Sequence, residues 1–152
     1  YADLRTPRAV VDDLMRREAW EDAARSLDAL LRRAPLDLDA HMRADFVFAR
    51  LGDDARQAHH RRFAEGLIRS IVERGDGRSL DAAWTVISTS EQYAVMMALG
   101  LEPTSQRLVH EDGHAFDVHE VSFAHDGSPA GAVHFNIDLP MAALARKLSA
   151  RA

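Results

Sequence analysis

Residues 106–123, which read QRLVHEDGHAFDVHEVSF, decide the fold of the second half of the chain. Two strand-like runs, 106–111 and 114–123, flank Asp112-Gly113, a pair typical of a two-residue hairpin turn. A two-residue turn fixes the cross-strand pairs, of which three are predicted here: Gln106 with His119, Val109 with Phe116, and Glu111 with His114. We therefore expect an antiparallel hairpin over residues 104–123, with Val109 and Phe116 on its buried face.

Further strand and helix signals surround this hairpin. Residues 84–87 (WTVI) form a short β-type run, and residues 132–138 alternate with Val133, Phe135 and Ile137 predicted to point inward. Ser88-x-x-Glu91 is a capping box that opens a helix ending at Gly100. A final helix is expected from Pro140, with the apolar residues Met141, Leu144 and Leu148 on one face. These elements predict a three- or four-stranded antiparallel sheet with two helices.

The first half shows helical periodicity. Four helices are expected: from Thr6-Pro7, from Trp20 to before Pro35, from about Asp37 to Leu51, and from Asp53 or Asp54 to Glu73. Thr6 is the expected N-cap of the first helix, and Gly52 ends the third. The predicted apolar stripes are Leu38, Met42, Phe46 and Ala49 on the third helix, and Ala55, His59, Phe63, Leu67 and Ile71 on the fourth.

The spacing of these helices resembles the tetratricopeptide repeat (TPR), which has a period of 34 residues. Ala23, Leu27, Leu30 and Pro35 occupy positions of that pattern, and Gly52 falls at the turn of the next unit. The similarity covers one unit and part of a second, and the usual tryptophan, glycine and tyrosine set is missing. The predicted fold class is therefore α+β, with TPR-like antiparallel helices packed on a small C-terminal antiparallel sheet and two further helices.

The length of 152 residues predicts one domain, residues 1–152. Within it we expect a helical lobe, residues 1–75, and a sheet-containing lobe, residues 79–152, on either side of the turn Gly75-Asp76-Gly77. The end of the apolar stripe on the fourth helix is predicted to pack against the sheet or the helix around Met96, which would make the two lobes one cooperative unit.

Charge and composition exclude several classes of function. Residues 1–78 carry 15 arginines against 15 acidic residues, whereas residues 79–152 carry 4 basic against 9 acidic residues, which accounts for the net charge of −5. Neither half has the basic surface that nucleic-acid binding needs. No run approaches the length of a membrane span. The absence of cysteine excludes disulfides and thiolate metal sites.

Histidine and carboxylate residues concentrate on the predicted sheet. They are His110, Asp112, His114, Asp117, His119, His125, His134, Asn136 and Asp138. Imidazole and carboxylate bind divalent metals when no thiolate is present. Asp117, His119 and His134 are the three candidate ligands, because alternation places Asp117 and His119 on one face and His134 is the histidine inside the final strand. The alternative is a solvated polar face of a one-sided sheet, with no cofactor.

The second half also resembles an uncharacterised bacterial family, domain of unknown function 4919. The residues that carry the resemblance are the stretch 71–77 (IVERGDG), Ala83, Val86-Ile87, Glu91 to Tyr93, Gly100-Leu101, Asp117-Val118, Glu120-Val121 and 135–137 (FNI). The resemblance implies a shared fold over nearly the whole chain and no catalytic residue. It also favours export to the periplasm or the medium over a cytoplasmic location. A chain that begins at Tyr1 fits removal of a signal peptide or simple trimming.

Two functions from different classes follow from these observations. The repeat-like helices, together with the lack of a complete catalytic constellation, favour a non-enzymatic module that binds a protein or peptide or serves a structural role. The alternative is a metal-dependent hydrolase-type enzyme built on the acidic, histidine-rich sheet face. Oligomeric state is left open by the sequence.

Overall fold

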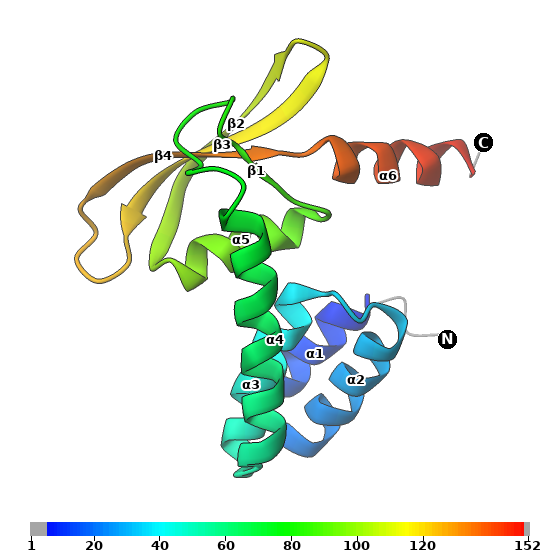
Figure 1. The fold of residues 1–152 in the computed structure, drawn as a ribbon. Coiled ribbons are helices and arrows are strands. Elements are labelled where there is room, and N and C mark those ends of the chain that lie inside the picture. Colours follow the sequence, from blue (N-terminus) through cyan, green and yellow to red (C-terminus); the bar gives the residue numbers. More distant parts are fainter. Residues whose placement is uncertain (1–5, 151–152) are drawn as a thin grey trace. The chain divides into compact units, whose positions relative to one another are not determined.

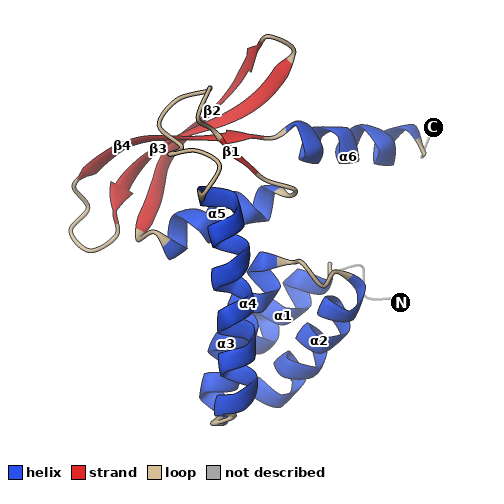
Figure 2. Cartoon of the chain, in the orientation of Figure 1, coloured by secondary structure: helices blue, strands red, loops and turns tan. Residues whose placement is uncertain are grey.

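A computed structural model describes residues 6–150 of the chain (Figure 1). The elements are α1 (Pro7–Arg16), α2 (Trp20–Arg33), α3 (Leu38–Leu51), α4 (Asp54–Val72), β1 (Trp84–Thr85), α5 (Thr89–Ala98), β2 (Leu101–Glu111), β3 (His114–Phe123), β4 (Pro129–Asn136) and α6 (Asp138–Ser149). Four helices thus precede a four-stranded sheet that is accompanied by two further helices (Figure 2). The predicted α+β class is confirmed.

The chain divides into two compact units, which we call the helical unit (residues 1–67) and the sheet unit (residues 68–152). The boundary falls inside α4, rather than at the Gly75-Asp76-Gly77 turn where the predicted helical lobe ends. The expectation that all 152 residues form one cooperative domain stays a prediction. No helix among residues 6–150 is both long enough and apolar enough to cross a membrane.

The helix ends in the helical unit follow from their capping residues. Pro7 is the first residue of α1, and the hydroxyl of Thr6 accepts a hydrogen bond from the backbone N–H of Ala9. Asp37 caps α3 in the same way, with its carboxylate accepting from the N–H of Ala40. Gly52 ends α3 in the left-handed conformation, with φ of 69°. The Thr6 N-cap and the Gly52 stop were predicted correctly, and α3 begins beside Asp37 as expected.

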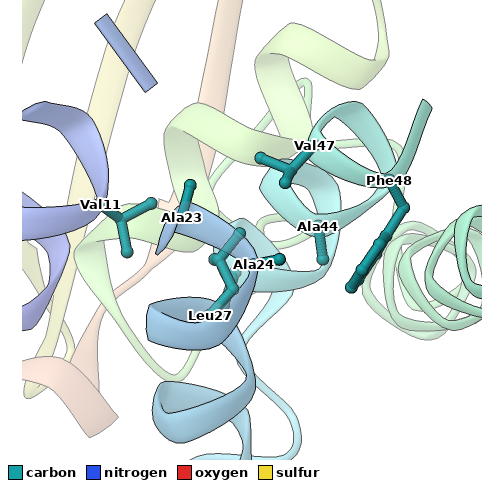
Figure 3. Close-up of a cluster of buried hydrophobic side chains, with 8 residues drawn as sticks. Val11, Ala23, Ala24, Leu27, Ala44, Val47 and Phe48 are labelled. Atoms are coloured by element: carbon teal, nitrogen blue, oxygen red, sulfur yellow. The ribbon is translucent and has the colours of Figure 1, made fainter. Parts of the chain in front are cut away.

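Small side chains form much of the core of the helical unit (Figure 3). The buried cluster consists of Val11 from α1, Ala23, Ala24 and Leu27 from α2, and Ala40, Ala44, Val47 and Phe48 from α3. Because alanine has a short side chain, α2 can pack closely against both α1 and α3. The predicted stripe on α3 is therefore wrong at Phe46, which is 44% exposed, while Ala44 and Val47 are fully buried.

The buried face of α4 also differs from the prediction. His59 and Phe63 are exposed, whereas His60 and Ala64 are buried. The predicted stripe repeated every four residues, and each such step rotates about 40° past a full turn of a 3.6-residue helix. Over four steps the drift is about 160°, so a strict four-residue repeat cannot remain on one face.

His60 is paired with a histidine of α3. Its Nδ1 lies 3.0 Å from Nδ1 of His41, and Nε2 of His41 lies 2.9 Å from the carbonyl oxygen of Pro35. Since a carbonyl can only accept, His41 carries its proton on Nε2, and its Nδ1 accepts from His60. Burial, and then the positive charge that His41 and His59 can carry, lower the pKa of His60.

The sheet has the strand order β1-β4-β3-β2 and is mixed. The strands β2, β3 and β4 are antiparallel neighbours, but β1 pairs parallel to β4. The predicted purely antiparallel sheet is therefore wrong at its edge. Antiparallel neighbours can be joined by hairpins, whereas β1 is separated from β4 by α5, β2 and β3, so no hairpin sets its direction.

The central hairpin has the predicted turn and register. Asp112 and Gly113 both have positive φ, 49° and 80°, as a type I′ turn requires. The three predicted pairs form: Gln106 with His119, Val109 with Phe116, and Glu111 with His114. On β4 and just after it, Val133, Phe135 and Ile137 are buried as predicted.

The two helices of the sheet unit depart from the prediction in detail. The side chain of Ser88 does not cap α5, although the Glu91 carboxylate accepts from the N–H of Ile87 at 2.7 Å. The final helix begins at Asp138, two residues before Pro140. The expected apolar residues of α6, Met141, Leu144 and Leu148, are exposed.

Replacing Gly113 by valine is expected to destabilise the protein by about 1 kcal/mol or more, because a β-branched residue resists positive φ. The measurement is the free energy of unfolding in denaturant. Gly66→Val is the matched control, since Gly66 lies in α4, where a Cβ would meet nothing within 4 Å. Equal stability of the two variants would contradict a strained turn.

Candidate functional site

Asp117 and His119 lie on one face of β3, as predicted, and that face is covered by α5. The two side chains are 5% and 0% exposed. Gln92 of α5 reaches both: its amide Nε2 donates to Asp117 Oδ2 at 2.8 Å, and its Oε1 lies 2.7 Å from His119 Nε2. The polar face that could have been solvated is therefore an interior network of Asp117, Gln92 and His119.

Hydrogen bonding fixes the tautomer of His119. Gln92 donates through its nitrogen to Asp117, so its oxygen accepts, and His119 must carry a proton on Nε2. The remaining ring nitrogen, Nδ1, is buried and has no hydrogen-bond partner among residues 6–150. The rings of Tyr93 and Phe135 meet the imidazole edge-on, with centroids 5.6 and 5.8 Å away. Burial lowers the pKa of His119, against a smaller opposing effect of Asp117.

His134 lies on the opposite face of the sheet. It is paired with Val118, between Asp117 and His119. Its Nδ1 and its backbone N–H both donate to the carbonyl oxygen of Gly77, at 2.9 and 2.8 Å. The predicted convergence of Asp117, His119 and His134 is therefore wrong. Within residues 6–150 no group of three or more histidine, aspartate or glutamate side chains is arranged to hold a metal ion.

A one-residue shift in the pairing of β3 with β4 explains why the prediction for His134 is wrong. The register between β3 and β4 shifts between Val121, which pairs with Gly131, and Ser122, which pairs with Pro129. If the Ser122 register continued without the shift, His134 would lie opposite Asp117, as the metal hypothesis requires. Gly131 has φ of 93°, which fits a glycine at a bulge. Gly131, which directly precedes the predicted strand at residues 132–138, was the signal that could have revealed it.

The exposed histidines do not gather into a site. His110 and His125 are exposed. His114 Nδ1 lies 2.6 Å from Asp138 Oδ2, while Asp138 Oδ1 accepts from the N–H of Ala115 at 2.8 Å. The Ala115 N–H first, and then the bonded His114, lower the pKa of Asp138. This pair joins the start of β3 to the start of α6.

An open groove of about 750 Å³ lies in the helical unit. It is lined by α1, the turn that follows it, the start of α2 and the outer face of α3. Trp20 and Phe46 meet edge to face, with ring centroids 5.9 Å apart. The Arg50 guanidinium carbon lies 5.0 Å from the Phe46 centroid and 5.8 Å from that of Trp20. We call this feature the Trp20 groove.

The arginines of the Trp20 groove differ in their partners. Arg43 is bonded to Asp39 and to Asp12, so its charge is compensated. Arg16 pairs with Asp13. Arg50 stacks on aromatic rings but has no carboxylate partner among residues 6–150. The groove thus presents aromatic surface beside one uncompensated, positioned cation.

Neither Gln92 nor the Trp20 groove was predicted from the sequence. Gln92 is 1% exposed on a helix whose expected core residues were apolar, and no spacing marks a polar residue as buried. Phe46 was assigned to the apolar stripe of the third helix, as aromatic residues at helical spacing usually are. The available signal was the pair Ala40 and Ala44, one turn apart, which marks the close-packed face of α3.

Comparison with known families identifies the family of this chain. The family described as Domain of unknown function (DUF4919) matches residues 8–145 of the chain. The chain belongs to this family. No curated protein and no solved structure matches it. The resemblance inferred from residues 71–137 is thereby confirmed, and the roles of residues in this DUF4919 protein rest on its own geometry.

Gln92→Leu is expected to destabilise this DUF4919 protein by about 3 kcal/mol, because Asp117 and His119 would each lose a buried hydrogen-bond partner. Unfolding in denaturant measures the loss. The control is the triple variant Gln92→Leu, Asp117→Val, His119→Phe, which removes all three polar groups together. Its cost should be well below the sum of the three single changes; simple additivity would contradict a coupled network.

The lowered pKa of His119 predicts loss of stability in acid. Unfolded histidine titrates near pH 6.5, whereas the buried ring stays neutral to lower pH. The unfolded state therefore gains a proton first, and stability falls as the pH decreases through about 6.5 toward the folded pKa.

His119→Gln keeps a donor toward Gln92 but does not titrate. Between about pH 7.5 and pH 5 the variant should lose less unfolding free energy than the wild type. Since the pKa of His60 is also lowered, NMR titration of the His119 ring separates the two contributions. A His119 pKa above its ordinary value would contradict the burial argument.

Proposed function

We propose that this protein is a non-enzymatic peptide-binding module and that the peptide lies in the Trp20 groove. The observation that carries the proposal is the cluster of Trp20, Phe46 and Arg50, which is open to solvent and lies on the surface of a packed helical core. Tryptophan, tyrosine and arginine are the residues that contribute most to binding energy at protein interfaces.

The mutual contacts of these three side chains favour binding without rearrangement. Phe46 is 44% exposed and contacts both Trp20 and Arg50, which also contact each other. Side chains already held by their neighbours lose less conformational entropy when a ligand binds. The groove therefore offers apolar area for a ligand side chain at a low entropic cost.

The location of the titratable groups supports binding over catalysis. The Asp117, Gln92 and His119 side chains are at least 95% buried, and the unpaired Nδ1 of His119 is itself enclosed. A general base must come within hydrogen-bond reach of its substrate. A substrate in solution does not reach this nitrogen without opening the contact between α5 and the sheet.

The test is selection of a random heptapeptide display library on the immobilised protein, followed by binding measurements on the enriched peptides. Phe46→Ala should weaken binding at least about tenfold, a loss of about 1.4 kcal/mol. Phe63→Ala is the matched control, because Phe63 is 40% exposed on α4 and does not line the groove.

Tryptophan fluorescence locates the bound peptide. The chain has two tryptophans, Trp20 and Trp84, and Trp84 is 6% exposed in the sheet unit. In a Trp84→Phe variant the emission of Trp20 should change on binding. Failure to enrich any peptide, or enriched peptides that leave Trp20 emission and Phe46→Ala affinity unchanged, would overturn the proposed function.

A further inference from the structure

We infer that the Trp20 groove selects a peptide segment with a single side-chain carboxylate, which pairs with Arg50. This inference rests on the proposed function and names the chemistry of its ligand. The partner is an internal aspartate or glutamate flanked by apolar residues, rather than a long acidic tract.

The position of Arg50 is fixed without the use of its hydrogen-bonding edge. Its guanidinium lies against the rings of Phe46 and Trp20, at 5.0 and 5.8 Å from their centroids. It also belongs to the last turn of α3, where the helix dipole favours a positive charge. A guanidinium that stacks through its face keeps its N–H groups available for a carboxylate, which it can bind in a two-pronged geometry.

Charge compensation elsewhere in the groove selects Arg50 as the binding cation. Arg43 already binds Asp39 and Asp12, and Arg16 binds Asp13. A ligand carboxylate would have to compete with these intramolecular carboxylates, whereas at Arg50 it meets no competitor within the described residues 6–150. The favourable position for the ligand carboxylate is therefore at Arg50, beside the Trp20 and Phe46 rings.

Glu18 limits the charge of the ligand. It lines the same groove, is exposed, and forms no ion pair among the residues that the structure describes. A second carboxylate on the ligand near Glu18 would be repelled, because like charges in close proximity disfavour each other. This is why we expect one carboxylate with apolar neighbours.

The open shape of the groove identifies the source of the carboxylate. The groove is open to solvent rather than enclosed, so a peptide chain can continue beyond it. A site that captures a chain end does not need to let the peptide continue. We therefore assign the carboxylate to an internal side chain rather than to the C-terminus of the partner.

Three synthetic heptapeptides built from leucine, alanine and serine test the inference. The first has a central glutamate and blocked ends, the second has glutamine in its place, and the third is the glutamine peptide with a free C-terminal carboxylate. Binding is measured by Trp20 fluorescence in the Trp84→Phe background. The blocked glutamate peptide should bind about tenfold more tightly than the blocked glutamine peptide, and more weakly as salt rises.

Variants assign the preference to Arg50. Arg50→Gln should reduce the affinity for the glutamate peptide to that for the glutamine peptide, and Arg50→Lys should give an intermediate value because the planar fork is lost. Arg62→Gln is the matched control, since Arg62 is exposed on α4 and has no ion pair among the described residues. Circular dichroism and the unfolding midpoint establish that each variant is folded.

Each other outcome overturns a defined part of the inference. Equal affinity for the glutamate and glutamine peptides removes the carboxylate preference but leaves peptide binding intact. Tighter binding of only the free-ended peptide moves the recognised carboxylate to a chain end. If none of the three peptides binds, the inference fails, while the proposed function is judged separately by the library selection.

Discussion

The type I′ turn at Asp112-Gly113 sets the register of the central hairpin, and the side-chain arrangement of the sheet depends on it. Both residues adopt positive φ, which only a small set of residues accepts without strain. Because side chains alternate along a strand, a slip of one residue would transfer each buried residue to the other face. With the observed register, Asp117 and His119 lie beneath α5, and Phe116 and Val118 lie on the other face.

That register also creates a requirement which α5 has to meet. An aspartate and a histidine on a covered face need hydrogen-bond partners, since unpaired buried polar groups are costly. One glutamine meets the requirement, because its amide donates to Asp117 and accepts from His119. The position of Gln92 along α5 and its orientation relative to the sheet are therefore tightly constrained. The lone pair on His119 Nδ1 has no partner in the described part of the chain, and the burial that lowers the pKa of this ring makes the interface sensitive to acid.

Sequence-based predictions were accurate where neighbouring residues decide the structure and failed where contacts between distant segments decide it. Predictions from local signals were correct. The helices α1 and α3 begin beside Thr6 and Asp37, α3 ends at Gly52, and the hairpin forms its predicted pairs. The trio Asp117, His119 and His134 was predicted from alternation within single strands, which is correct for the first two. The prediction failed for His134, because the register shift beside Gly131 places its side chain on the sheet face opposite to that of Asp117 and His119. A bulge of one residue is decided by tertiary pairing, not by alternation.

Helix orientation presents the same difficulty in the helical unit, with a more informative result. Counting apolar residues placed Phe46 in the core, but the buried face of α3 is the one that carries Ala40, Ala44, Val47 and Phe48. Phe46 is two residues from both Ala44 and Phe48, and a rotation of about 200° around the helix turns it to the outer surface. On this outer surface Phe46 contacts Trp20 and Arg50 and remains exposed to water. Because two neighbours hold this exposed aromatic residue, the surface around it keeps a fixed shape. Recognition of an apolar segment with one carboxylate requires such a surface beside an uncompensated arginine.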